Sequence, residues 1–438
     1  MNLANSKSQQ APGPDGLVTI NVEPASLKIL RDLQARYGNV IEFEAPNDRR
    51  GMFINDPASV RRLLVRHHPK YRKGRGFERV EMLLGNGLIV SDGDVWRRSR
   101  TMIQPAFSRQ NIHRLVELMI DCTKHKAVAW RAVAEAGGVL NVTQEMSDFA
   151  LELILRAIFG DDYEQRILSG GENPFAFLSQ DATRDLSVVM KLRHLRELLL
   201  DIIASRRSGD VSDSYDFLSM YLAAVDKQGN GFSDRELLDE LMTLIVAGYE
   251  TSAGTLNWAW YLLSHHPEAA DKLQVEAAAY GAAIEGAADD PALTGMNWSQ
   301  QVLDETLRLY PPVWLFSRRS LENDEIEGYA IPAQTDIYLS PFILQRTAEF
   351  WTDPETFNPE RFGADGPYQK GDRPFFPFSL GPRRCVGEYF SFLEMKIHLG
   401  MLSQQFRLLP VNEQHPGLDL GINLRSLSDI KLKPELRH

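Results

Sequence analysis

Cysteine is scarce in this 438-residue sequence, which contains only Cys122 and Cys385. Two cysteines leave no disulfide framework and no zinc site built from several thiolates, so small folds that depend on either are excluded. Unpaired cysteines are typical of a reducing compartment, and we therefore expect a cytoplasmic protein. A single thiolate can still bind a metal ion or take part in catalysis.

Positive charge is also in the minority, with 48 Lys and Arg against 59 Asp and Glu, a net charge of −11 and a pI near 5.5. This balance excludes binding to a nucleic-acid backbone as the main function. Residues 61–75 and 95–116 nevertheless contain no acidic residue. They are either ordinary solvated helix faces or a local basic surface that steers an acidic partner protein.

The sequence lacks a secretion signal. Residues 1–16 are polar, which predicts a flexible N-terminal tail followed by one folded domain over residues 17–438. Residues 241–266 are long enough to cross a bilayer and carry one formal charge, at Glu250. Glu250 lies among Gly, Thr, Ser and Asn residues, and such a polar centre favours a helix buried in protein over one in lipid. We therefore expect a soluble protein without a membrane anchor.

Apolar spacing is helical over most of the chain after Pro57, and no linker-like stretch divides it. This pattern predicts a single large domain, mainly α, with a small β-rich flank. Ser233 and Glu236 form a capping box before a helix that Pro267 interrupts, about 33 residues or roughly 50 Å long. We expect short strands at 40–43 and 52–55, and further helices at 25–37, 58–67, 94–102, 111–135, 142–159, 185–207, 214–225, 298–310 and 388–406.

The most specific motif is FSLGPRRCVG, residues 378–387, which places Cys385 just before an amphipathic helix. Free N–H groups and the positive end of a helix favour thiolate over thiol, and a thiolate can ligate iron. Gly381 and Gly387 let the backbone turn tightly around a bulky group. The alternative is a cysteine that packs as a small apolar residue, which is our reading of Cys122.

This segment resembles the haem-binding loop of the cytochrome P450 superfamily, the haem-thiolate monooxygenases. Four further segments resemble motifs of that family and follow its order: WRRSR at 96–100, AGYET at 247–251, ETLR at 305–308 and FNPERF at 357–362. The resemblance covers most of the chain and is closest to soluble bacterial members. It implies a P450-type domain with haem b between the long central helix and the helix after Cys385.

In this family the cysteine thiolate is the axial ligand of the haem iron and favours O–O cleavage, which assigns that role to Cys385. The family's usual histidine before Arg346 is absent, and Gln345 stands there. Arg318 resembles a propionate contact, with Arg319 as the alternative. The resemblance implies further haem contacts from Phe378, Gly381, Arg383, Gly387, Trp96, Arg100, Ala247 and Gly248.

The resemblance also assigns Thr251 and Glu250 to proton delivery, because a hydroxyl beside a carboxylate can hold a water molecule in an apolar pocket. The alternative for Thr251 is a hydrogen bond to the carbonyl four residues earlier. Glu305, Arg308 and Arg361 resemble the family's buried ion-paired triad. We expect this triad to be structural, because loss of one partner would leave an uncompensated buried charge.

The expected substrate is a lipophilic small molecule, such as a terpenoid, a fatty acyl chain or a polyketide. The residues that the resemblance places over the haem are largely apolar: Phe77, Val80, Met82, Leu83, Leu84, Leu244, Ala247, Val313, Trp314, Leu315 and Phe316. Because most apolar runs are simply core, these assignments need the structure.

Three functions are compatible with the sequence. The first is a monooxygenase that uses dioxygen and electrons from NAD(P)H through a separate acidic ferredoxin or flavodoxin with its reductase, because the chain is too short for a fused reductase. The docking surface would include Arg72, Arg97 and Arg98. The second is a peroxide-driven oxidase or rearrangement enzyme, against which Glu250 and Thr251 argue. The third is a non-enzymatic haem sensor, against which the lack of an output domain argues.

Overall fold

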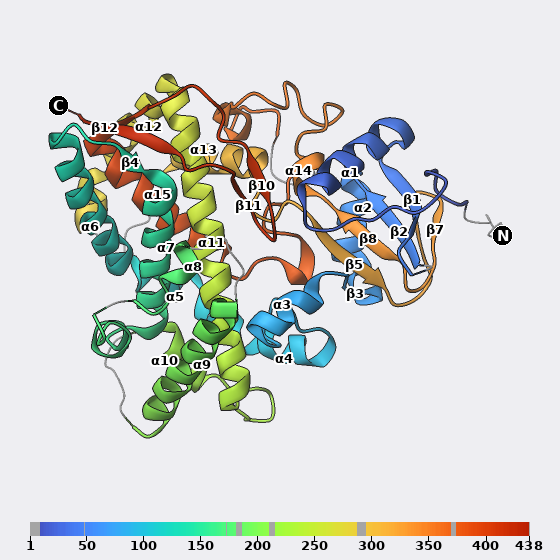
Figure 1. Cartoon of the computed structure of the whole chain (residues 1–438), viewed down its shortest axis with the longest axis horizontal. Helices are drawn as coiled ribbons and strands as arrows, with labels where there is room; N and C mark the ends of the chain where they lie inside the picture. Colours follow the sequence, from blue (N-terminus) through green and yellow to red (C-terminus); the bar gives the residue numbers. More distant parts are fainter. Residues whose placement is uncertain are drawn as a thin grey trace.

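The computed structural model describes residues 9–47, 49–171, 173–180, 186–209, 215–286, 295–368 and 374–437. Within these ranges, the side chains of residues 79, 83, 179–180, 186–189 and 280–286 are not described. A helical region fills the left and centre of Figure 1, and a smaller sheet region lies at the right. The predicted mainly α domain with a β-rich flank is confirmed.

The helical region is built from long helices with their apolar residues buried. Its helices are α3 Phe77–Leu84, α4 Gly93–Ile103, α5 Arg109–His113, α6 Val116–Glu135, α7 Val142–Phe159, α8 Phe177–Gln180, α9 Leu186–Arg207, α10 Phe217–Ala223, α11 Asp234–His265, α12 Pro267–Gly286, α13 Asn297–Leu309 and α15 Glu388–Gln405. The helix expected over 111–135 is interrupted between α5 and α6. Residues 185 and 214, where two predicted helices begin, lie outside the described residues.

Helix α11 is the long central helix that the sequence predicts. The Ser233 side chain accepts from the Glu236 N–H, the Glu236 side chain accepts from the Ser233 N–H, and the helix runs for 32 residues to His265. Figure 1 shows it crossing the helical region from top to bottom. It packs along α7, and α15 packs against α6, α12 and α13.

The sheet region is organised around one five-stranded sheet of order β1-β2-β8-β5-β3. Its strands are β1 Val40–Ala45, β2 Arg49–Ile54, β3 Tyr71–Lys73, β5 Phe316–Ser320 and β8 Asp336–Leu339. Only the β2–β8 pair is parallel. The nearby helices are α1 Pro24–Tyr37, α2 Pro57–Arg61 and α14 Pro341–Leu344, and a wider helical turn continues α2 over Arg62–Arg66.

Smaller sheets complete the fold. They are the pair β6 Asp324–Ile326 and β7 Tyr329–Ile331, the pair β10 Leu418–Leu420 and β11 Leu424–Ser426, and a three-stranded sheet of β4 Leu140–Asn141, β12 Lys431–Leu436 and β9 Phe406–Pro410. The β10–β11 hairpin lies beside α11 (Figure 1). The buried apolar residues form two clusters, a large one among the helices and a smaller one under the five-stranded sheet.

The N-terminal segment differs in part from the expected flexible tail. Residues 1–8 lie outside the described residues. Gln9 exchanges backbone hydrogen bonds with Gly328 and Ala330, and Pro12 accepts one from Glu42. Residues 9–12 are therefore fixed along strands. No helix in the described part of the chain is long and apolar enough to cross a membrane.

Candidate functional site

The loop before α15 places Cys385 at the start of that helix. A short helical turn at Gly381–Arg383 precedes it, and the Cys385 N–H donates to the Phe378 carbonyl at 2.9 Å. Gly381 has φ 68°, and a Cβ there would lie 2.3 Å from the Leu64 carbonyl oxygen. Only glycine therefore fits at this position, which fixes the loop against the sheet region.

The surroundings of the Cys385 thiol act on its charge in both directions. Although the side chain has exposed surface, the surrounding protein raises its pKa by desolvation. The Gly387 N–H, Arg100 and Arg384 oppose this rise. The charge of Glu388 adds to the rise, and the pKa of Cys385 is raised on balance. A positive metal centre bound to this exposed residue would instead favour the thiolate.

Arg100 and Trp96 both lie near this loop, on α4. Arg100 donates to the Arg384 carbonyl at 2.8 Å and to Gln104 at 3.1 Å. The guanidinium carbon of Arg383 lies 3.8 Å from the centre of the Trp96 ring. In this arrangement Arg100 supports the cysteine loop, and Trp96 supports the arginine that the sequence assigns to a haem propionate.

Three cations meet next to the cysteine loop, where β3 and β5 pair. Lys73 is directly opposite Arg318 in the antiparallel register, so both side chains leave the same face of the sheet. Arg383 donates to the Ser91 carbonyl at 2.8 Å and forms an ion pair with Asp92. These four residues line one small cavity together with Arg72, and Asp92 is the acidic residue of that lining.

The cation cluster, as we call Lys73, Arg318 and Arg383, carries more positive charge than its surroundings neutralise. Burial lowers the pKa of Lys73 well below its usual value, and the neighbouring arginines lower it further. Burial followed by Arg383 lowers the pKa of Arg318 to about 10. Burial also lowers the pKa of Arg383 to about 10, against the opposing effect of Asp92.

With Arg72 also in the lining, cationic side chains outnumber the one carboxylate of this cavity. Acidic groups such as the propionates of haem would offset this imbalance. The residues present therefore fit a haem: the cation cluster would hold its propionates, and Cys385 would bind its iron. Sequence reasoning missed Lys73 because it placed this residue in an exposed basic stretch. The feature that could have identified Lys73 is its place in a short strand, because alternate side chains of a strand point inward.

The structure separates the two neighbouring arginines that the sequence left open. Arg319 pairs with Asp336 through two contacts, at 2.6 and 3.1 Å. Arg318 is buried. Among the described residues its side chain makes one hydrogen bond, to the carbonyl of its neighbour Ser317 at 2.9 Å. Of the two, Arg318 lies in the cation cluster.

On α11, the Thr251 hydroxyl donates to the Ala247 carbonyl at 2.8 Å, which is the alternative noted from the sequence. The Glu250 carboxylate pairs with Arg425 of β11, at 2.8 Å from Nε. A Cβ on Gly248 would lie 2.7 Å from Cγ1 of Ile154. Gly248 therefore allows the close approach of α7, a packing role that the sequence did not predict.

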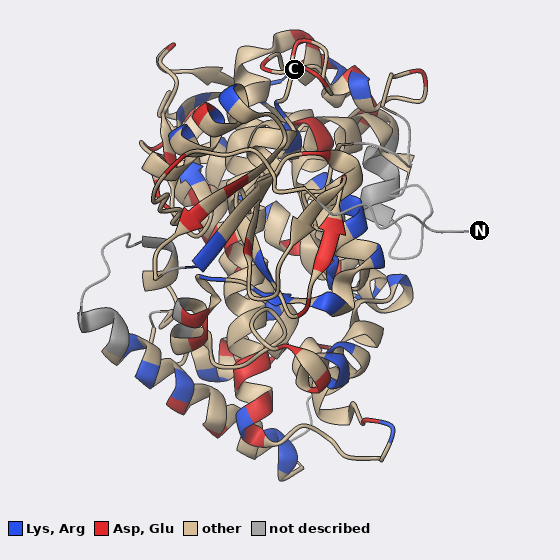
Figure 2. Cartoon of the chain, turned by 90° about the vertical axis from the view of Figure 1, so that its right-hand side faces the viewer, with Lys and Arg blue, Asp and Glu red and all other residues tan. Residues whose placement is uncertain are grey.

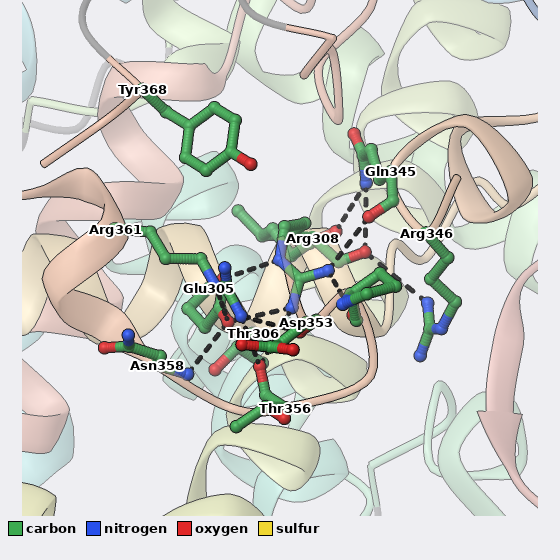
Figure 3. A network of polar contacts seen from close by, with 12 residues as sticks. Glu305, Thr306, Arg308, Gln345, Arg346, Asp353, Thr356, Asn358, Arg361 and Tyr368 are labelled. Atoms are coloured by element: carbon green, nitrogen blue, oxygen red, sulfur yellow. Dashed lines mark hydrogen bonds and ion pairs between the residues drawn. The ribbon is translucent and has the colours of Figure 1, made fainter. Parts of the chain in front are cut away.

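The predicted triad lies in a dense polar network (Figure 3). Glu305 accepts two hydrogen bonds from Arg308, at 2.6 and 2.8 Å, and one from Arg361 at 3.1 Å. The remaining guanidinium N–H groups reach backbone carbonyls, among them those of residues 345, 353, 354 and 356. Glu305 and Arg308 are fully buried. The network links α13 to the segment before the cysteine loop.

Gln345 takes part in the core and does not reach the cation cluster. It is fully buried, donates to the carbonyls of Leu307 and Arg308, and accepts from the Phe376 N–H at 3.1 Å. The amide therefore joins the end of α13 to the chain that leads to Cys385. Arg346 pairs with Glu355 at 3.1 Å.

The residues proposed to line a substrate pocket fall into several groups. Trp314 is fully buried and its indole N–H donates to the Gly421 carbonyl at 2.9 Å, so it offers no surface to a ligand. Met82 is 79% exposed and lies on the surface. The side chain of Leu83 lies outside the described residues. Leu84 and Leu315 are buried, whereas the others keep partial exposure: Phe77, Val80, Leu244, Ala247, Val313 and Phe316.

A buried carboxyl that the sequence did not single out lies nearly two turns into α15. Glu394 is 1% exposed and accepts a hydrogen bond from the Ser252 hydroxyl of α11. Burial raises the pKa of Glu394 to about 8, so this group is protonated at neutral pH. It joins the cysteine-loop helix to α11 beside Thr251.

A family model described as Cytochrome P450 matches residues 17–424. The chain belongs to the cytochrome P450 family. It is therefore a haem-dependent oxidoreductase of the monooxygenase type, as the sequence predicts at this level. The fold agrees with a crystal structure of a cytochrome P450 (CYP102L1), with a TM-score of 0.84 at 21% identity over 98% of this chain and 100% of that chain.

Curated relatives include proteins of Streptomyces, two of which are named as oxygenases. Cyclooctatin synthase of Streptomyces melanosporofaciens is 30% identical over 81% of this chain and 80% of its own length. Cyclooctat-9-en-7-ol 5-monooxygenase of the same organism is 27% identical over 91% of both chains. Pentalenene oxygenase of Streptomyces avermitilis is 29% identical over 80% of both chains.

Proposed function

We propose that this P450 oxygenates a terpenoid-like lipophilic molecule in the cytoplasm, with electrons from NAD(P)H supplied through separate redox partners. The observation that carries the proposal is the juxtaposition of Cys385, at the start of α15, with the cation cluster that suits two propionates. The similarity to pentalenene oxygenase and cyclooctat-9-en-7-ol 5-monooxygenase supports the substrate class.

When bound, haem supplies the activation of dioxygen. The chain's own residues position and shield it: Cys385 is the thiolate ligand, Arg100 supports the loop through the Arg384 carbonyl, and the cation cluster holds the propionates. The partly exposed apolar residues form the substrate side of the site and need few polar groups to orient a lipophile. Two aromatic rings also lie close to cations of the cluster. The centre of the Phe77 ring is 4.6 Å from Nζ of Lys73, and the centre of the Phe316 ring is 5.0 Å from Cζ of Arg318.

Proton delivery is proposed to run through Thr251 and Glu250. For this role the Thr251 hydroxyl must leave the Ala247 carbonyl and donate toward the haem side, because a hydroxyl has one proton to give. Thr251→Ala should retain haem and substrate binding but lower the product formed per NAD(P)H consumed. Unchanged coupling would show that protons arrive by another route.

The test of the proposed function is a screen of terpenoid, fatty acyl and polyketide compounds for a low-spin to high-spin shift of the haem spectrum. Cys385→His should lose the red-shifted Soret band of the ferrous carbonyl complex and lose oxygenation, whereas Cys122→Ala should keep both. Loss of the band in Cys122→Ala would overturn the ligand assignment. A spin shift confined to fatty acyl compounds would overturn the substrate class.

An acidic ferredoxin or flavodoxin is the proposed electron donor, docking beside the cysteine loop. Figure 2 shows Lys and Arg interspersed with Asp and Glu over much of the molecule. Arg98 is bound to Asp226 and Glu236, each at 2.8 Å, so its charge is neutralised within the chain. Lys73 is turned inward. Arg97 is exposed but forms an ion pair with Asp94, and Arg72 is exposed at the edge of the cavity.

Reduction by an acidic ferredoxin should slow as salt rises, because the Debye length is about 10 Å at 0.1 M. Arg72→Glu should slow it further without changing substrate binding. Reduction that is independent of salt would contradict docking at this surface.

The peroxide-driven reaction remains a second candidate, because one observation favours it. Both groups of the proposed proton relay are engaged elsewhere: Thr251 with Ala247, and Glu250 with Arg425. Product formation with peroxide alone, at a rate equal to that with NAD(P)H and redox partners, would decide for this candidate.

A further inference from the structure

Arg425 joins two parts of the molecule that are 175 residues apart in sequence. Its Nε donates to Oε1 of Glu250 at 2.8 Å, and a second N–H of the guanidinium reaches the same oxygen. The Glu250 side chain is 13% exposed and that of Arg425 is 44% exposed. The pair therefore lies at the boundary between the interior and solvent, where exchange of partners is possible.

A second carboxylate stands beside Arg425 on the β10–β11 hairpin. Asp419 is directly opposite Arg425 in the antiparallel register, so both side chains leave the same face of the hairpin. Burial lowers the pKa of Arg425, but Glu250, then Tyr249 and then Asp419 act against burial, and the pKa is raised. One arginine thus has two carboxylates within its range, one on α11 and one on its own hairpin.

The hairpin is attached to the segment that carries several proposed substrate contacts. The Leu424 N–H donates to the Pro312 carbonyl at 2.8 Å, and Trp314 donates to Gly421 in the turn. On the other side, Asn257 of α11 donates to Ser426 at 3.2 Å. Hydrogen bonds therefore connect Pro312 and Trp314 directly to the hairpin that carries Arg425.

We propose that Arg425 is a positioning residue that holds the Glu250 carboxylate while the hairpin is docked and moves to Asp419 when residues 312–316 shift. This inference rests on the proposed function, because it assigns proton delivery to Glu250. Once released and protonated, Glu250 passes its proton to the Thr251 hydroxyl, which passes on its own. Solvent then reprotonates the carboxylate, so the protein has no net change in protons.

The test compares Arg425→Gln with Asp419→Asn, because the proposal gives them opposite effects. Loss of Arg425 frees Glu250. Loss of the Asp419 carboxylate removes the alternative partner of Arg425, which then stays on Glu250. Proton transfer should be about two- to fivefold faster in Arg425→Gln and slower by a similar factor in Asp419→Asn. The solvent isotope effect on product formation should therefore fall in the first variant and rise in the second. Both effects should vanish in the Glu250→Gln background.

A second readout needs no turnover. In the resting haem protein, hydrogen exchange of amides 424–426 should rise in Arg425→Gln and in Glu250→Gln, and should fall in Asp419→Asn. Arg207→Gln is the matched control, because it removes an arginine that binds α11 away from Glu250, at the first residue of the helix, through Asp234 at 2.6 Å. It should leave both readouts at their wild-type values.

Faster exchange in Asp419→Asn would overturn the proposal, because a merely structural hairpin loosens whichever partner is lost. Exchange that changes as expected, with an unchanged isotope effect, would also overturn it. If the wild-type protein binds haem but oxygenates nothing, the proposed function fails and the role in proton delivery fails with it. Hydrogen exchange would then still report whether Arg425 changes partners.

Discussion

Two groups of buried arginines in this P450 differ in how well their charge is matched. In the triad network, Arg308 and Arg361 share Glu305 and direct their other N–H groups at backbone carbonyls. In the cation cluster, Arg318 has a single hydrogen bond to its neighbour's carbonyl, and Lys73 faces it across two strands. The first group is saturated by the chain itself, whereas the second has donors left over.

This difference separates a structural role from a binding role. A buried cation that finds all its acceptors in the chain stabilises the fold, because removal of one member leaves the others uncompensated. A cation without enough acceptors is costly to bury and is offset only by a ligand of opposite charge. The comparison therefore explains why the same residue type supports α13 at one place and suits haem propionates at another.

The largest expected effect comes from breaking the saturated group. Arg308→Gln should lower the free energy of unfolding by about 3–5 kcal/mol, because Glu305 is left as a buried charge with a weaker partner. The loss should be the same with and without haem. Urea unfolding of both forms measures it, with Arg193→Gln of the exposed Arg193–Glu197 pair as the control.

A smaller effect, and one that depends on the ligand, is expected in the cation cluster. Arg318→Gln should leave the haem-free chain as stable as the wild type or more stable, because an excess buried charge is removed. Haem dissociation should become faster by about 10- to 100-fold, because one charge-assisted hydrogen bond is lost. Transfer of haem to an acceptor protein measures this rate. Equal destabilisation of both forms would remove the distinction between the two groups.

The smallest effect is a dependence on pH. The pKa of Lys73 is lower in the folded chain than in the unfolded chain, where it is about 10.4. At a pH between these two pKa values the unfolded chain binds one more proton at this residue than the folded chain does. The stability of the haem-free chain should therefore rise with pH in this window, by at most about 1.4 kcal/mol per unit from this group. Lys73→Met should flatten the rise. Unfolding curves at several pH values below 10 provide the measurement, and an equal slope in both proteins would contradict the account.

Local sequence signals predicted the frame of the molecule. The capping box and Pro267 determine α11 because both act within a few residues. Cys385 could be assigned because its motif is local and specific. The triad could be assigned because its two motifs accompany that of Cys385 in the order of the family. These signals concern neighbours along the chain, and they were sufficient for the fold class and for the elements that carry the proposed ligand.

Contacts between distant segments could not be predicted in the same way. Nothing near Glu250 in sequence indicates Arg425, and nothing near Lys73 indicates that strand pairing places it opposite Arg318. Trp314 was assigned to a pocket because apolar runs look alike whether they face a ligand or the core. The resemblance assigned Gly248 to haem contact, whereas the structure shows that a side chain there would meet Ile154.

The most direct test of the contrast between the two groups is the binding of haem and of its dimethyl ester, in which both carboxylates are blocked. The account predicts that the ester binds the wild-type chain about 10- to 100-fold more weakly than haem. In the Arg318→Gln, Arg383→Gln double variant the difference should largely disappear, whereas in Arg193→Gln it should remain. Equal affinity of the wild-type chain for haem and for the ester would contradict the assignment of the cation cluster to the propionates.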